Sequence, residues 1–167
     1  AVARQSIVLL KNDVKLLPLD PNRLKTVAVI GQLATDGLSQ LGSWRAQGKA
    51  DDVVTILAGI TAAAPKNLKI LSAPGADPRN NDLTGIPAAV KLAKSADVTV
   101  LVIGEDFDMS GESRSRSSIE LPPSQRELAM QVAEAVHKYG RAMGITAAPI
   151  YGGSPMETQL RALKRGV

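Results

Sequence analysis

The chain has 167 residues, of which 44% are hydrophobic and only 2% aromatic, and its formal net charge is +4. This length suits one domain, and a core built from Ala, Val, Ile and Leu favours parallel strands covered by Ala-rich helices. The absence of cysteine excludes disulfides, cysteine–zinc sites and thiol catalysis. We expect no membrane span, because no apolar run approaches the required length of roughly 18 residues. No signal peptide is visible, and the compartment stays unknown.

Short β-branched runs alternate with amphipathic stretches along the chain. A helix is predicted over residues 3–13, followed by an extended lead into the first strand. Strands are predicted at residues 25–31, 67–72, 98–103 and 145–150, and the helices between and after them at 53–64, 85–96, 123–140 and 154–167. This alternation predicts a three-layer α/β/α sandwich with a mostly parallel, four-stranded sheet.

The last two predicted helices carry start signals. Ser124 with Glu127, and Ser154 with Glu157, match the S-x-x-E pattern of a capping box. The first of these helices presents one apolar face, formed by Leu128, Val132, Ala135 and Tyr139. The last helix has basic residues near its end that fit either nucleic-acid contact or a solvated helix face, and the lack of interleaved aromatic residues favours the solvated face.

Ligands of parallel sheets bind beyond the carboxyl ends of the strands, and the loop after the third strand is the richest in reactive side chains there. It carries four acidic and two basic residues: Glu105, Asp106, Asp108, Glu112, Arg114 and Arg116. A carboxylic acid on this loop can act as the general acid of a glycosyl transfer. The alternative is a solvated loop whose charges pair with one another.

Several segments of residues 1 to about 125 occur together and in order in a known family. These are "ARQSIVLLKND", "KTVAVIGQLA", "LGSW", "TILAGI" and "VLVIGEDFDMSGESRSRSSIELP". They resemble the second, α/β sandwich domain of glycoside hydrolase family 3, which includes β-glucosidases. The resemblance implies a flavodoxin-like strand order of 2-1-3-4.

The same resemblance implies roles for residues. Glu112 matches the acid/base residue of the family, whose nucleophile is an Asp on a preceding (β/α)8 barrel domain. Trp44 matches a loop that lines the sugar site in some members, and an indole face can stack on a pyranose ring. Glu105 and Asp106 are further candidates for substrate binding.

The first half of the stretch "DMSGESRSRSSIELPPSQREL" is a polar loop, and its second half is the start of a predicted helix. From about residue 124 to residue 167, the sequence resembles a segment of a DEAD-box RNA helicase, with "PSQRELAMQV" and "YGGSPMETQLRAL" as the matching motifs. This resemblance implies RNA contacts by Arg126, Gly152 and Gly153. No phosphate-binding G-x-x-x-x-G-K-[ST] loop is present, so we expect no ATP hydrolysis.

These patterns predict one domain over residues 1–167, with a glycosidase-like part (1–124) and a helicase-like part (125–167). Such a chimera, designed or recombined, would have no turnover of its own, because a retaining glycosidase needs two carboxylates about 5–5.5 Å apart and the nucleophile is missing. Two alternatives stay open: a β-glucosidase module that needs a barrel partner, and a weak RNA-binding module.

The expected partners follow from the same patterns. We expect no metal, no other cofactor, no membrane and no nucleic acid as a main partner. We also predict a homodimer, because strand 145–150 would leave an exposed edge that invites pairing with another chain or exchange of the C-terminal strand–helix unit.

Overall fold

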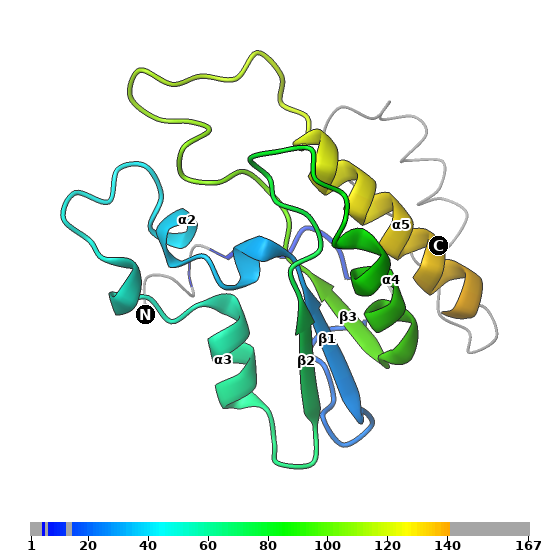
Figure 1. Cartoon of the computed structure of the whole chain (residues 1–167). Coiled ribbons are helices and arrows are strands. Elements are labelled where there is room, and N and C mark those ends of the chain that lie inside the picture. Colours follow the sequence, from blue (N-terminus) through cyan, green and yellow to red (C-terminus); the bar gives the residue numbers. More distant parts are fainter. Residues whose placement is uncertain (1–4, 6, 13–14, 141–167) are drawn as a thin grey trace.

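The computed structural model describes residues 5, 7–12 and 15–140, and three parallel strands lie at its centre (Figure 1). They are β1 (Thr26–Ile30), β2 (Lys69–Ala73) and β3 (Val98–Leu101), in the order β2-β1-β3. In this register, Val27 of β1 lies opposite Ile70 of β2 and Val98 of β3. The described strands agree with the first three of the predicted order 2-1-3-4. The fourth predicted strand, residues 145–150, lies outside the described residues, so the four-stranded order stays a prediction.

Helices cover both faces of the sheet and complete three layers. They are α2 (Gly37–Leu41), α3 (Ile56–Ala63), α4 (Ile86–Ser95) and α5 (Pro123–Gly140), with short 3₁₀ turns at Gln32–Ala34 and Ala50–Asp52. Helix α3 covers one face of the sheet, whereas α4 and α5 pack side by side on the other (Figure 1). The prediction of an α/β domain is therefore confirmed. In the described part, no helix has the length and apolar character needed to cross a membrane.

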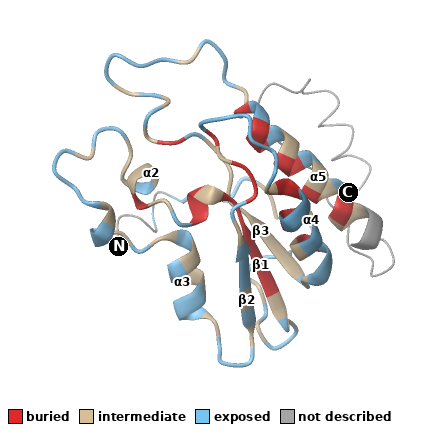
Figure 2. Ribbon diagram, viewed as in Figure 1, coloured by how far each residue is buried: buried red, intermediate tan, exposed pale blue. Residues whose placement is uncertain are grey.

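The central strand β1 holds the core together, because its side chains alternate between the two faces. Ala28 and Ile30 face α4 and α5, where they join a buried cluster with Ile86 and Leu128. Val27 and Val29 face the opposite side, where partly buried side chains of α3 and the neighbouring strands pack on them. Figure 2 shows β1 largely buried and β2 largely exposed. The continuous apolar run of β1 is typical of a parallel strand covered on both faces.

Of the predicted helix over residues 3–13, the structure describes Gln5, which is helical, and residues 7–12, which are not. Residues 7–12 are irregular. The apolar side chains from Ile7 to Leu10 are 61–91% exposed. A helix this short is marginal in water unless its apolar face packs on something. The apolar spacing was therefore not enough to predict a helix here.

The start of α5 also differs from the prediction. The backbone N–H of Arg126 donates to the carbonyl of Pro122 at 3.0 Å, so Pro123 occupies the first helical position, where its missing N–H costs nothing. Ser124 consequently lies inside the first turn, and its hydroxyl donates to the carbonyl of Asp77 at 2.7 Å. The predicted capping box at Ser124 is therefore wrong, because two prolines start the helix before it. The second predicted capping box and the last helix lie outside the described residues.

Candidate functional site

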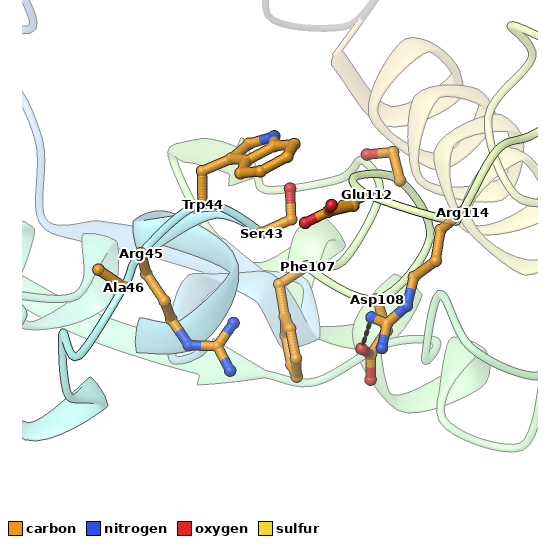
Figure 3. A pocket seen from close by; sticks show the side chains of 9 residues that line it. Ser43, Trp44, Arg45, Ala46, Phe107, Asp108, Glu112 and Arg114 are labelled. Atoms are coloured by element: carbon orange, nitrogen blue, oxygen red, sulfur yellow. Dashed lines mark hydrogen bonds and ion pairs between the residues drawn. The ribbon is translucent and has the colours of Figure 1, made fainter.

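A pocket of about 490 Å³ lies between two loops beyond the carboxyl ends of the strands (Figure 3). One wall is the segment from Ser43 to Ala46, in the loop of residues 42–49, which we call the Trp44 loop. The other wall comes from the loop of residues 102–122, the Glu112 loop, which joins β3 to α5. The pocket therefore lies where ligands of parallel sheets bind.

Trp44 and Glu112, both predicted from the sequence, line this same pocket. Figure 3 shows the Glu112 carboxylate directed toward the segment that carries Ser43 and Trp44. Trp44 is 74% exposed, so its ring is accessible to a ligand. The structure thus places an aromatic surface and a carboxylate at one opening.

Glu112 projects from a tight turn that brings the two loops into contact. The backbone N–H of Arg114 donates to the carbonyl of Gly111 at 3.2 Å, and Ser113 adopts a left-handed φ of 59°. Gly111 has a φ of 128°, and a Cβ atom on it would lie 2.7 Å from Cβ of Ser43. Only glycine allows this approach without displacing a loop. The turn therefore fixes Glu112 close to the Trp44 loop.

The charges around Glu112 are paired, whereas Glu112 itself is not. Asp108 forms an ion pair with Arg114, and Glu105 forms one with Arg116. Within the part of the chain that the structure describes, the Glu112 carboxylate has no hydrogen bond or ion pair. The expectation that the loop charges pair with one another therefore holds for Asp108 and Glu105. It does not hold for Glu112, which also lines the pocket.

The floor of the pocket contains Phe107. The guanidinium of Arg45 lies 4.7 Å from the centre of the Phe107 ring, within the range of a cation–π contact. This contact joins the two loops a second time, below the opening that Trp44 and Glu112 line (Figure 3). No sequence pattern indicated it, because the two residues are far apart in the chain.

Arg79, which the sequence analysis did not single out, gathers three carboxylates behind the pocket. Its Nε atom forms an ion pair with Asp106, whose side chain is fully buried. Its other nitrogen atoms lie 3.1 Å from Asp36 and 3.8 Å from Asp77. Asp106 therefore lies behind the pocket and does not line it, and Glu105 does not line it either. Their predicted roles in substrate binding stay predictions.

The pKa values of this cluster follow its contacts. Burial alone would raise the pKa of Asp36, but hydrogen bonds from Ser39 and the charge of Arg79 together lower it. Burial alone would lower the pKa of Arg79, but the hydrogen bond to Asp106 and the three carboxylate charges raise it. Both shifts favour the charged forms of Asp36 and Arg79. A search of the described residues finds no group of three acidic, histidine or cysteine side chains suited to a metal ion.

Of the three predicted RNA contacts, the structure describes only Arg126. Arg126 is exposed in the first turn of α5. Gly152 and Gly153 lie outside the described residues. The predicted RNA contacts therefore stay predictions.

Comparison with known proteins identifies relatives of most of the chain. Residues 7–143 match the glycosyl hydrolase family 3 C-terminal domain. The periplasmic β-glucosidase of Salmonella typhimurium is 42% identical over 148 residues, which cover 76% of this chain and 19% of that protein. A β-xylosidase of Formosa agariphila is 35% identical over 144 residues, which cover 84% of this chain and 19% of that protein.

The chain is also similar to solved structures of β-glucosidases and β-xylosidases. The β-glucosidase from Listeria innocua in complex with glucose has a TM-score of 0.63 and 29% identity, over 77% of this chain and 17% of that one. A family 3 exo-β-xylosidase bound to a xylobiose aziridine probe has a TM-score of 0.66 and 31% identity, over 76% of this chain and 16% of that one. The chain therefore spans about a fifth of the length of the curated relatives that it matches.

The extent of the family match also bears on the predicted junction. The match runs from residue 7 to residue 143 and so passes through residue 124, where the glycosidase-like part was predicted to end. Helix α5, with Arg126, belongs to the same match as the strands. The comparisons give no support to a helicase segment or to a chimera.

Proposed function

The chain belongs to the glycosyl hydrolase family 3 C-terminal domains, and we propose that it supplies the acid/base residue and one wall of the sugar site of a β-glycosidase. One observation carries the proposal. Glu112 faces the pocket unpaired, whereas the carboxylates of Glu105 and Asp108 on the same loop are held by arginines. A general acid has to be free to give its proton to the leaving oxygen and to take it back from water.

The proposed substrate is a β-linked glucoside or xyloside. The relatives named above are β-glucosidases and β-xylosidases, and these names support that choice. Trp44 adds physical support, because its exposed indole offers an apolar face of the kind that stacks on a pyranose ring.

The second carboxylate of a retaining reaction is proposed to come from a barrel domain. Such a reaction needs a nucleophile about 5–5.5 Å from the acid/base residue. Asp108 is the other acidic side chain that lines the pocket, but its ion pair with Arg114 engages it. We therefore expect the isolated chain to lack turnover, as predicted from the sequence. In this proposal, residues 7–143 form one glycosidase-type domain, and a chimeric origin would concern only the residues after 143.

The test compares the chain alone with the chain supplied with the barrel domain of a relative, using aryl β-glucosides and aryl β-xylosides. We expect no hydrolysis by the chain alone and hydrolysis by the pair. Glu112→Gln should lower that rate by about 10²–10⁴-fold, because this is the usual contribution of a general acid. Glu120→Gln makes the same chemical change in the same loop, outside the pocket lining, and should leave the rate unchanged.

Two results would overturn the proposal. One is hydrolysis by the chain alone that disappears in Glu112→Gln, since it would show that this chain already holds a nucleophile. The other is a barrel–chain pair whose activity is the same in Glu112→Gln and in the parent.

A further inference from the structure

Resting on the proposed function, we infer that Arg79 is a positioning residue that sets where Trp44 and Glu112 stand across the pocket. Arg79 is not among the residues that line the pocket. It acts through a closed ring of contacts that joins the base of the Trp44 loop to the base of the Glu112 loop.

The first half of the ring starts at the loop of Glu112. The Nε atom of Arg79 is ion-paired with Asp106, and the other oxygen of Asp106 accepts the backbone N–H of Asp108 at 2.8 Å. This second bond fixes the backbone where the Glu112 loop turns away from the sheet. Because the Asp106 side chain is fully buried, its charge depends on the arginine for compensation.

The second half of the ring runs to the loop of Trp44. Arg79 lies 3.1 Å from Asp36, whose carboxylate accepts the backbone N–H of Ser39 at 3.1 Å and its hydroxyl at 2.8 Å. Asp36 is thereby the N-cap of α2, the short helix that leads directly into the Trp44 loop. A shift of Asp36 would move this helix start and the loop that follows it.

Ser39 closes the ring. Its hydroxyl oxygen accepts the backbone N–H of Phe107 at 3.3 Å, and Phe107 follows Asp106 in the chain. The bases of the two loops are thus joined to each other directly by Ser39 and indirectly by Arg79. Planar guanidinium groups suit this task, because their nitrogen atoms can reach two carboxylates at fixed angles, whereas a lysine ammonium is a single point charge.

The test uses the composition of the chain, which has one tryptophan and no cysteine. Ser110→Cys places a unique thiol on the pocket lining, opposite Trp44, for labelling with bimane. Tryptophan quenches bimane at short range, so the emission reports how close the two loops are. Trp44→Phe in the labelled protein defines the emission without quenching.

Two variants disrupt the contacts of Arg79 with Asp106 and Asp36 in different ways. Arg79→Lys keeps the positive charge but loses the planar guanidinium that reaches two carboxylates. Arg79→Met combined with Asp106→Asn removes both charges, so no buried carboxylate is left uncompensated, and the amide can still accept the Asp108 N–H. Arg23→Lys and Arg23→Met are the matched controls, because Arg23 is exposed and lies before β1, outside both loops. Thermal unfolding followed by circular dichroism shows whether each variant folds cooperatively.

We expect the double variant to unfold cooperatively and its bimane emission to rise towards the Trp44→Phe level, with a smaller rise in Arg79→Lys and none in the Arg23 controls. A role in stability alone would lower the melting temperature and leave the quenching as in the parent. That result would overturn the inference. Loss of cooperative unfolding in both Arg79 variants would also overturn it, since Arg79 would then serve the whole fold. No sugar enters the measurement, so its failure is separate from a failure of the proposed function.

Discussion

Single carboxylates have different roles in this domain, depending on what donates to them. Asp97, at the amino ends of the strands, accepts the backbone N–H groups of Lys25 at 2.7 Å and Thr26 at 2.8 Å. The hydrogen bond from Lys25 lowers the pKa of Asp97 most, and the bond from Thr26 lowers it further. Glu112, at the opposite end of the sheet, has no such donor among the described residues. The backbone donors give Asp97 a structural role, whereas the absence of such donors agrees with the acid/base role proposed for Glu112.

The role of Asp97 gives a pH-dependent prediction. Its pKa is lowered in the folded chain, so its contribution to stability is present above its unfolded pKa of about 3.9 and is lost as the pH falls through the folded value. Asp97→Asn should therefore destabilise the chain at pH 7 by about 1 kcal/mol, a modest figure because the site is exposed. The difference should shrink at pH 3. Urea unfolding at the two pH values measures it.

The control is Asp51→Asn, an exposed carboxylate in the turn Ala50–Asp52, with no side-chain hydrogen bond in the described structure. It should change little at either pH. An equal loss of stability at pH 7 and pH 3 in Asp97→Asn would contradict the prediction, because it would show that the charge of Asp97 is not what matters.

At the scale of elements, α5 is an integral part of the core. Leu128 is fully buried, and it joins the cluster formed by β1, α4 and α5. We expect Leu128→Ala to lower the free energy of unfolding by about 2–5 kcal/mol, since it removes buried methyl groups and leaves a cavity. Met130→Ala, on the same helix but 44% exposed, is the control and should stay within about 0.5 kcal/mol. Denaturant unfolding measures both. A change in Leu128→Ala as small as that of the control would mean that α5 does not pack on the sheet.

The elements show what local patterns can predict. Short apolar runs located β1, β2 and β3, and the continuous run of β1 is typical of a strand that is buried on both faces. The apolar spacing located α5, including Leu128 and Val132 on its buried face. The same spacing failed at residues 7–12, since periodicity does not show whether an apolar face has anything to pack on.

The candidate site was only partly predictable for a related reason. Glu112 and Trp44 could be selected because they sit in short motifs that carry the family resemblance. Arg79 could not, since its partners Asp106 and Asp36 lie 27 and 43 residues away in the chain. Contacts between loops depend on how the strands are ordered in the sheet, and no local pattern of charges records that order. The same holds for the contact between Gly111 and Ser43.

At the scale of the whole molecule, the sheet has two outer edges. Among the described residues, β2 and β3 each pair only with β1. Unpaired N–H and C=O groups on an edge strand attract the strand of another chain unless charge, proline or a covering element prevents it. Beside the β2 edge, Leu71 is 40% exposed, so an apolar side chain accompanies the free backbone groups. The homodimer predicted from the sequence was placed at strand 145–150, which lies outside the described residues, so it stays a prediction.

We therefore expect the chain to associate with itself as its concentration rises, either through a sheet edge or by exchange of the C-terminal segment. Sedimentation or light scattering over a range of concentrations measures this. Leu71→Lys should weaken the association if the β2 edge forms the contact, because a lysine there would have to be desolvated. Ala62→Lys adds the same charge on an exposed position of α3 and should leave the association unchanged. A dimer that persists in Leu71→Lys would point to the β3 edge or to C-terminal exchange. A monomer at high concentration would contradict the prediction and would mean that residues outside the described range cover both edges.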